Sequence, residues 1–272
     1  MADKKFTVLD FKRKKEAGGK ITMLTAYDHP MAALVDKAGI DAVIVGDSVG
    51  MVILGYESTV RVTMDEMIHH SRAVRRGIRN AFLIGDMPFM SYQASDEDAV
   101  RNAGRFVKEA GCDAVKIEGG REVCSRAEAI MDAGIPVLGH IGLTPQSVSK
   151  LGGYRVQGRD RETAVRLVED AVFLEKAGCF AVVLECVPKE LAQKITEKLR
   201  IPTIGIGAGC HCDGQVLVTH DIIGYFDRFV PKFVKQYANV SKNILDAITS
   251  FKSETESGAF PDDDHSFTSF KG

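Results

Sequence analysis

Five short apolar segments of the sequence end in an ionisable side chain. Asp47 follows the run VIV and Gly46, and the other four are Asp86 after FLIG, Glu118 after AVKI, His140 after PVLG and Glu185 after AVVL. A buried strand that ends in a carboxylate or an imidazole is typical of an active-site rim, where a rigid element holds a functional group at the start of a loop. The pattern predicts a single site that gathers these five side chains.

Three of the five, Asp47, Asp86 and Glu118, carry like charges and repel one another unless a cation or protons separate them. Their ligand atoms are all oxygens, with no thiolate or imidazole among the three, which favours Mg²⁺ over Zn²⁺. Because Mg²⁺ usually takes only one or two protein carboxylates directly, Glu118 can act through water. The sequence therefore predicts a magnesium site.

The remaining groups suggest acid–base chemistry. Lys116, two residues before Glu118, points into the same space and can hold a substrate carboxylate or ketone oxygen. A carboxylate on an apolar strand can have its pKa raised and serve as a general base, so Glu185 is the predicted base, with a salt bridge to a neighbouring loop as the alternative. His140 can donate a hydrogen bond to a substrate oxygen, and a purely structural histidine is the alternative.

A joint between a helix and a strand recurs four times and indicates the scaffold. It reads KAGIDAVIVG from Lys37, EAGCDAVKIEG from Glu109, DAGIPVLGH from Asp132 and KAGCFAVVLE from Lys176. Glycine is typical of the residue that follows a helix, and the apolar run after it is typical of a buried parallel strand. Repeated joints of this kind predict a parallel sheet with helices outside it.

Eight strands follow from these joints. They are predicted near 21–25, 42–46, 82–86, 114–118, 136–140, 181–185, 202–206 and 215–219. Helices are predicted at 65–79, where Thr63 and Glu66 form a capping box, at 96–110, where Ser95 is the N-cap, and at 7–17, where an extra helix closes the bottom of the barrel. Eight such units predict a (β/α)₈ barrel. A doubly wound open sheet is the less favoured alternative fold, because no G-x-G-x-x-G motif follows the first strand.

In a barrel, neighbouring strands lie about 4.8 Å apart, so the five strand ends can ring one opening. Side chains alternate between the two faces of a strand, so Asp47 is expected on the same face as Val43 and Val45. Each of the other four ionisable residues is likewise expected on the face of the residue two positions before it.

Two long segments, 48–62 and 142–160, are candidates for lids or plain surface loops. Gly205-x-Gly207-x-Gly209 lies where many barrels bind phosphate, but tight turns alone would need these glycines, so no phosphate site is assigned.

Composition narrows the class of protein. The chain has 272 residues, a net charge of −2 with scattered basic residues, and no apolar run of membrane-spanning length, so neither nucleic-acid nor membrane binding is expected. Charges stand in the N-terminal segment where a secretory signal needs its apolar core, so we expect a soluble cytoplasmic protein. We expect one barrel domain over residues 1–252 and a polar, loosely ordered tail over residues 253–272.

The six cysteines are interpreted as reduced, because no export signal and no C-x-x-C pair occurs. Cys210-His211-Cys212 has tighter spacing than zinc knuckles and no second Cys/His pair nearby, so a structural role is preferred to a metal site.

Several motifs resemble the ketopantoate hydroxymethyltransferase family. They are TAYD at 25–28, VGDSVGM at 45–51, GDMPF at 85–89, VKIEGG at 115–120, GHIGLTPQ at 139–146, LECVP at 184–188 and IGIGAG at 204–209. The resemblance covers residues from about 5 to 250 and leaves out the polar tail.

The resemblance implies a barrel similar to the phosphoenolpyruvate/pyruvate type and an enzyme of pantothenate biosynthesis. It would transfer a hydroxymethyl group from 5,10-methylenetetrahydrofolate to 3-methyl-2-oxobutanoate with one Mg²⁺ per subunit, and would form a cytoplasmic homodecamer. Matched residue by residue, Asp47 and Asp86 would bind the metal, with Glu118 at it directly or through water. Ser48 would hold the keto-acid carboxylate, Asp47, Asp86 and Lys116 would border the substrate, and Glu185 would accept the proton.

Two other functions are compatible with acidic strand ends. A lyase or mutase of the isocitrate-lyase or phosphoenolpyruvate-mutase type also uses Mg²⁺ there, but such enzymes share a Lys-Lys-Cys-Gly-His loop that is absent from this sequence. A non-catalytic metal-dependent binder is the second alternative, and Glu185 argues against it because a binder needs no positioned base.

Overall fold

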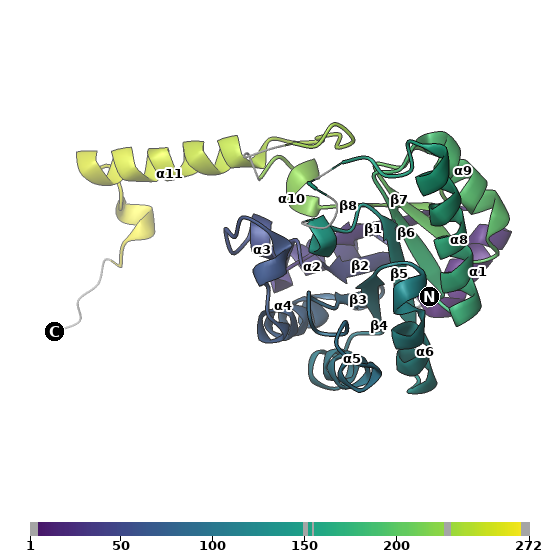
Figure 1. Cartoon of the computed structure of the whole chain (residues 1–272). Coiled ribbons are helices and arrows are strands. Elements are labelled where there is room, and N and C mark those ends of the chain that lie inside the picture. The colour runs from purple at the N-terminus through teal and green to yellow at the C-terminus, as the bar shows by residue number, and fades with distance from the viewer. Residues whose placement is uncertain (1–4, 149–151, 154, 226–229, 268–272) are drawn as a thin grey trace. The chain divides into compact units, whose positions relative to one another are not determined.

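Eight parallel strands close into a barrel with helices around it (Figure 1). The computed structural model describes residues 5–148, 152–153, 155–225 and 230–267. The strands follow one another round the ring in chain order, and β8 pairs in parallel with β1. The (β/α)₈ prediction is confirmed, and a doubly wound sheet is excluded because an open sheet would leave two unpaired edges.

The element bounds agree closely with the prediction. The strands are β1 (Ile21–Thr25), β2 (Ala42–Val45), β3 (Phe82–Asp86), β4 (Ala114–Glu118), β5 (Val137–Gly142), β6 (Ala181–Glu185), β7 (Thr203–Ile206) and β8 (Gly214–Leu217). The α-helices are α1 (Val8–Glu16), α2 (His29–Lys37), α3 (Val49–Val52), α4 (Met64–Gly77), α5 (Asp96–Ala110), α6 (Cys124–Asp132), α8 (Arg161–Ala177), α9 (Lys189–Lys198), α10 (Thr219–Ile222) and α11 (Val240–Ser257). Short 3₁₀ turns are η1 (Thr59–Arg61), η2 (Arg121–Val123), η3 (Pro145–Ser147) and η4 (Asp263–His265).

The four repeated Ala-Gly joints form the helix ends that the sequence predicts. Gly39, Gly111, Gly134 and Gly178 have φ of 77°, 69°, 86° and 100°, a region that side chains with a Cβ rarely adopt. Each glycine therefore lets the chain leave a helix and turn directly into the next strand. The predicted caps are also present, since the side chains of Thr63 and Ser95 accept hydrogen bonds from the backbone of Glu66 and Asp98.

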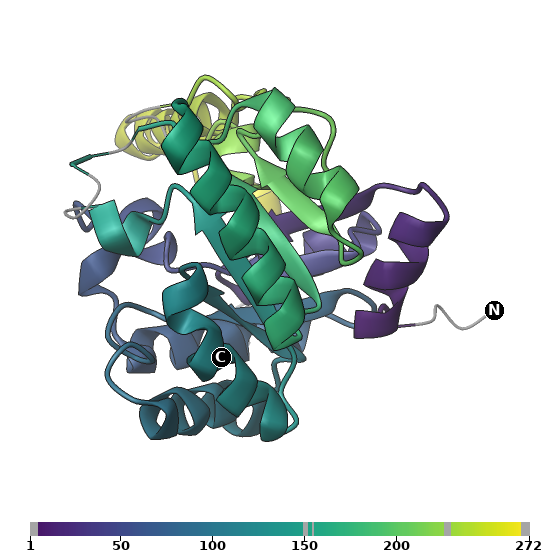
Figure 2. The same ribbon diagram turned by 45° about the vertical axis from the view of Figure 1, so that its right-hand side comes forward.

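Alternate strand residues divide the core into two layers. One layer fills the barrel with side chains such as Ile44, Ile84 and Val183. The other lies between strands and helices and includes Phe106 of α5 and Leu174 of α8. Glycines on the strands let two helices approach closely, because a Cβ at Gly139 would lie 2.9 Å from Leu174 Cδ1 and one at Gly85 would lie 2.2 Å from Phe106 Cδ1. Figure 2 shows α8 lying along β5 and β6.

Helix α1 closes the N-terminal end of the barrel, as predicted. Its Phe11 is fully buried in the interior layer, with its ring centroid 5.4 Å from that of Phe82 and 5.0 Å from that of Phe180. Lysines around it pair with aspartates that precede the strands: Lys14 lies 2.6 Å from Asp41, Lys15 lies 2.8 Å from Asp213, and Lys5 pairs with Asp113. Aromatic contacts of Phe11 and the three ion pairs thus hold this helix and Lys5 before it against the end of the barrel.

The two long segments contain helical turns. Residues 48–62 hold α3 and η1, so two short helical turns interrupt this segment. The other segment, 142–160, contains η3, and residues 149–151 and 154 of it lie outside the described residues.

The chain divides into two compact units, Met1–Thr219 and His220–Gly272. We expected the barrel domain to reach residue 252 and a polar tail to follow, but α11 runs across that point to Ser257. Residues 268–272 of the expected tail lie outside the described residues. Within the second unit, no residue of α11 is buried, and Leu245, Ile248 and Phe251 are 64%, 60% and 58% exposed.

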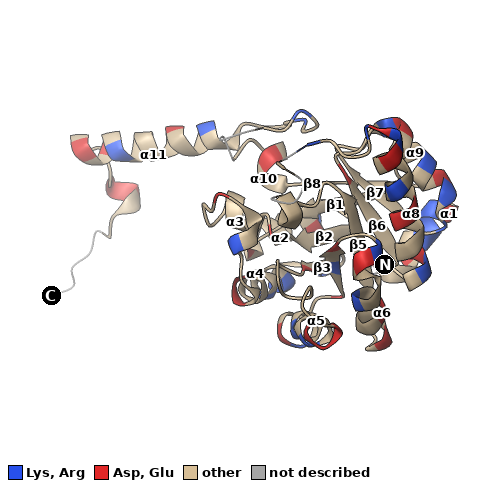
Figure 3. Cartoon of the chain, viewed as in Figure 1, with Lys and Arg blue, Asp and Glu red and all other residues tan. Residues whose placement is uncertain are grey.

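Basic and acidic side chains are interspersed along the outer helices, for example on α8 and α9 (Figure 3). None of the described helices is both long and apolar enough to span a membrane. The six cysteines are free thiols.

We predict that Gly85→Ala lowers the free energy of unfolding by about 1–3 kcal/mol, because the added methyl group overlaps the fully buried Phe106 ring. Equilibrium urea unfolding measures the change. Gly104→Ala on α5 is the control, since nothing lies within 4 Å of its added Cβ and alanine favours the helix. A Gly85→Ala midpoint equal to that of the wild type would show that this contact is not tight.

Candidate active site

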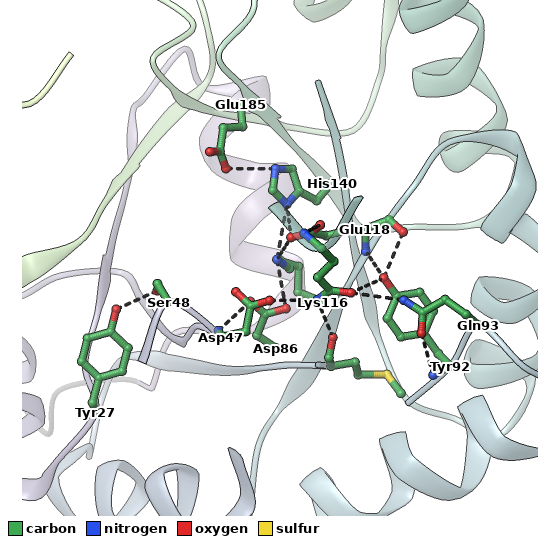
Figure 4. Close-up of polar contacts among 12 residues, drawn as sticks. Tyr27, Asp47, Ser48, Asp86, Tyr92, Gln93, Lys116, Glu118, His140 and Glu185 are labelled. Atoms are coloured by element: carbon green, nitrogen blue, oxygen red, sulfur yellow. Dashed lines mark hydrogen bonds and ion pairs between the residues drawn. The ribbon is translucent and has the colours of Figure 1, made fainter. Parts of the chain in front are cut away.

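The predicted residues meet at the carboxyl ends of β2 to β6 (Figure 4). Most of them are almost fully buried, with exposed fractions of 4% for Asp47, 2% for Asp86, 5% for Lys116, 5% for Glu118 and 3% for His140. The side chain of Glu185 is 17% exposed. A cluster of buried charged groups at one end of a barrel cannot be explained by packing, and it marks a functional site.

Alternation along the strands explains four of the five predicted side chains. Asp86, Glu118, His140 and Glu185 each lie two residues after an interior side chain or an interior-facing lysine, and so they point into the barrel mouth. For Asp47 the alternation argument is wrong. Val43 and Val45 belong to the layer between strands and helices, while Ala42 and Ile44 face the interior.

Asp47 reaches the site through a turn. Strand β2 ends at Val45, and residues 47–48 form the turn that leads into α3. The backbone N–H of Asp47 donates to Asp86 Oδ2 at 3.0 Å, which ties this turn to the end of β3. Turn geometry, which alternation cannot predict, therefore places the first carboxylate.

Lys116 lies at the centre of the cluster. Its Nζ is 2.9 Å from Asp86 Oδ1, 3.1 Å from Glu118 Oε1 and 3.3 Å from His140 Nδ1. Burial lowers the pKa of Lys116, but the charges of Asp86, Glu118 and Asp47 outweigh it and raise that pKa well above its usual value. Lys116 is thus a permanent cation with carboxylates from three strands around it.

One lysine does not neutralise every carboxylate. Burial, followed by the charge of Asp86, raises the pKa of Asp47 well above its usual value. Burial also raises the pKa of Asp86, aided by Glu118 and opposed by Lys116. Burial thus disfavours the charged form of both aspartates, and a further cation beside them would favour it.

Glu118, His140 and Glu185 form a line across the strand ends. His140 Nδ1 lies 3.5 Å from Glu118 Oε1, and His140 Nε2 lies 3.2 Å from Glu185 Oε2. Burial raises the pKa of Glu118, but Lys116 and His140 lower it, to about 2 overall. Burial and Lys116 lower the pKa of His140, and its contacts with the two glutamates raise it, to about 9 overall. The imidazole is therefore a cation between two carboxylates.

Ser48 lies half-buried beside the charged cluster, next to Asp47. Its hydroxyl shares a 2.8 Å hydrogen bond with the hydroxyl of the buried Tyr27, which stands just after β1. This pair gives the edge of the site a neutral hydrogen-bonding group that suits a carboxylate oxygen.

Sequence reasoning missed four side chains of the network. Tyr27, Tyr92, Gln93 and Gln146 carry no charge, so a search for ionisable strand ends passes over them. Gln146 and Tyr27 lie in two of the motifs that resemble the family, GHIGLTPQ and TAYD, and this position is the one sequence feature that could have indicated them. Gln146 Nε2 donates to Asp47 Oδ2 at 3.0 Å, and its backbone N–H donates to Glu118 Oε2 at 3.1 Å.

The donor set fits a magnesium ion held by few protein ligands. Among the described residues, no three Asp, Glu, His or Cys side chains form a ready-made metal cluster. Asp86 Oδ1 is buried without a hydrogen-bond partner, although Lys116 pairs with it. Asp47 and Asp86 supply oxygen ligands with excess negative charge, and one or two carboxylates are what Mg²⁺ commonly takes from a protein. Glu118 already pairs with Lys116, which suits a contact through water.

Comparison with known proteins relates the whole chain to one family of sequences. The family model described as ketopantoate hydroxymethyltransferase matches residues 5–263, so the match extends beyond residue 250, where the sequence motifs suggested that it ends. A 3-methyl-2-oxobutanoate hydroxymethyltransferase from Syntrophus aciditrophicus (strain SB) is 58% identical over 264 residues, covering 97% of each chain.

Solved structures with the same barrel are far less similar in sequence. Phosphoenolpyruvate phosphomutase from Streptomyces platensis subsp. rosaceus superposes with a TM-score of 0.63 at 16% identity over 93% of this chain and 88% of its own. A 2,3-dimethylmalate lyase, a member of the PEP mutase/isocitrate lyase superfamily, gives 0.58 at 14% identity over 92% and 88%. These likenesses support the predicted barrel type.

We predict that His140 in the metal-free protein titrates near pH 9, above the usual value of about 6.5. Because the folded-state pKa is raised, its charge stabilises the fold fully below about pH 6.5, and this contribution is lost as the pH rises through about 9. NMR titration of [¹⁵N]histidine-labelled protein measures the pKa.

Glu185→Gln should lower the pKa of His140, because it removes one of the two partner carboxylates. Glu190→Gln on the exposed start of α9 is the control and should leave it unchanged. A wild-type His140 that titrates at or below pH 6.5 would contradict the ion-pair arrangement.

Proposed function

The chain belongs to the ketopantoate hydroxymethyltransferase family of enzymes, and from that premise we propose that it converts 3-methyl-2-oxobutanoate to 2-dehydropantoate in pantothenate biosynthesis. The one-carbon donor is 5,10-methylenetetrahydrofolate, and water supplies the new hydroxyl oxygen as tetrahydrofolate leaves. The observation that carries this proposal is the buried cluster at the ends of β2 to β6, in which Lys116 and His140 stand among four carboxylates.

Cationic and hydroxyl groups of this cluster bind the keto acid. Ser48 holds the carboxylate of 3-methyl-2-oxobutanoate, and its hydrogen bond to Tyr27 fixes the orientation of the hydroxyl. Lys116, with Asp47 and Asp86 beside it, borders the substrate, and His140 borders it from the next strand. Positive charge next to the ketone favours the negative charge that develops on its oxygen when the C3 proton is removed.

Asp47 and Asp86 would hold one Mg²⁺ per subunit, with Glu118 directly at the ion or contacting it through water. When bound, this ion supplies Lewis-acid stabilisation of negative charge on the ketone and carboxylate oxygens. Two buried carboxylates whose neighbours are held in place by one lysine support this assignment, because a second cation beside them would stabilise their charged form.

Glu185 accepts the C3 proton. It is the most exposed of the four carboxylates, and its Oε2 contacts His140 Nε2 at 3.2 Å, so the imidazolium orients the base. The resulting carbon nucleophile attacks the methylene carbon of the folate, and hydrolysis completes the hydroxymethyl group.

We also propose a cytoplasmic homo-oligomer, a decamer by resemblance to the family. The exposed apolar side chains of α11 support self-association, since single chains rarely leave several large apolar groups on one helix in water. Sedimentation velocity measures the assembly directly.

The assay that tests this function follows the consumption of 3-methyl-2-oxobutanoate. Turnover should require both 5,10-methylenetetrahydrofolate and Mg²⁺, and excess EDTA should abolish it until Mg²⁺ is restored. Turnover without the folate would favour a lyase or mutase, and binding of the keto acid without turnover would favour a binding protein.

We predict that Glu185→Gln reduces turnover by about 10²- to 10⁴-fold, because a positioned base contributes roughly that factor. The variant should still bind Mg²⁺ and keto acid, but lose exchange of the C3 proton with solvent, which ¹H NMR in D₂O measures without the folate. Glu190→Gln should exchange at the wild-type rate. Unchanged exchange in Glu185→Gln would remove Glu185 from the role of base.

A further inference from the structure

Gln146, in η3 after β5, is a buried amide with hydrogen-bonding partners for both its nitrogen and its oxygen. Its Nε2 donates to Asp47 Oδ2 at 3.0 Å and to the backbone oxygen of Met87 at 2.9 Å. Its Oε1 lies 3.0 Å from the Tyr92 hydroxyl and accepts from Gln93 Nε2 at 3.2 Å. An amide has two N–H donors and two acceptor positions, and at this site both donors are used and two donor groups lie within reach of the oxygen.

The backbone of the same residue reaches a second carboxylate. The N–H of Gln146 donates to Glu118 Oε2 at 3.1 Å, while Glu118 Oε1 pairs with Lys116. Gln146 therefore contacts the turn after β2 through its side chain and the end of β4 through its backbone. It is 5% exposed, so water does not compete strongly for these bonds.

Tyr92 completes a closed network. Its buried hydroxyl accepts from the backbone N–H of Glu118 at 3.0 Å, and its one proton is within 3.0 Å donor–acceptor reach of two oxygens, Gln146 Oε1 and the backbone oxygen of Glu118. The backbone of Glu118 is thus held by Tyr92, its carboxylate by Gln146, and Tyr92 and Gln146 by each other. Networks of this kind fix orientation because their members hold one another by hydrogen bonds in a buried place.

We infer that Gln146 is a positioning residue for the divalent-cation site, and this inference rests on the magnesium site of the proposed function. By bonding Asp47 and Glu118 from one rigid point, it holds them in fixed orientations, so that less ordering is required when the cation binds. The amide is chemically specific at this position, since a carboxylate would face both Asp47 and the oxygen of Met87 with no proton to donate.

The test measures Mn²⁺ affinity in the intact, metal-stripped chain by electron paramagnetic resonance, with no folate and no turnover. Gln146→Met keeps the length of the side chain and removes its side-chain hydrogen bonds, including the one to Asp47, while the backbone bond to Glu118 remains. We expect affinity to fall by about 10- to 100-fold, as is typical when partners of metal ligands are removed. Gln157→Met is the matched control in the same segment, because its side chain bonds only to the backbone of Arg155 among the described contacts. It should bind Mn²⁺ as the wild type does.

Tyr92→Phe provides an independent variant should Gln146→Met fail to fold, since it removes a single oxygen. It should also weaken Mn²⁺ binding, and combining it with Gln146→Met should cost less than the two separate effects together, because both act through one network. Circular dichroism confirms that each variant is folded during the measurement.

Two results would overturn the inference and can be told apart. If the wild type binds Mn²⁺ and Asp47→Asn abolishes binding, while Gln146→Met and Tyr92→Phe bind like the control, only the positioning role is refuted. If the wild type itself binds no Mn²⁺, the magnesium site of the proposed function fails and the inference fails with it.

Discussion

A buried ammonium group among carboxylates is the interaction on which the site depends. Lys116 lies within 3.1 Å of both Asp86 and Glu118, and every one of these groups is nearly inaccessible to water. Removing one partner from a buried ion pair typically costs about 3–5 kcal/mol, because the remaining charge is left without solvation. The charges of the site therefore stabilise one another as a set, and none of them is dispensable to the others.

The barrel orders these charged groups with little further loss of conformational entropy, because Asp86, Lys116 and Glu118 lie at the ends of strands that packing already fixes. Interior side chains such as Ile84 and Val183 hold the strands from within, and Phe106 and Leu174 hold them from outside. Loops then add the neutral partners. Tyr92 and Gln146 come from the segments after β3 and β5, and they bond to the charged groups that the strands present.

The same barrel serves other chemistry in its structural neighbours. The phosphomutase and the dimethylmalate lyase share the architecture at 16% and 14% identity, which shows the fold and not the reaction. The family of this chain follows from the 58% identity to a hydroxymethyltransferase over nearly its whole length. A shared fold leaves the reaction open, because function depends on the side chains of a site.

Strand and helix positions were predictable because the signals are local. The apolar runs ended where β1, β3, β4 and β6 end, and the Ala-Gly joints marked helix ends whose glycines have positive φ. The charged residues of the site were also predictable, since Asp86, Lys116, Glu118, His140 and Glu185 follow from type and alternation alone. A parallel barrel brings all of its strand ends to one face, so sequence order gives spatial proximity directly.

The tertiary structure alone decided how these groups are paired. Asp47 enters the site through a turn held by Asp86, against the alternation of β2, and no local pattern predicts that bend. Gln146 meets Asp47 across 99 residues of sequence, and Tyr92 meets Glu118 across 26. Neutral hydrogen-bonding side chains are common in any sequence, and only the folded chain shows which of them face a buried carboxylate. The sequence by itself thus determined the barrel and its charges, while three-dimensional packing determined the hydrogen bonds that orient those charges.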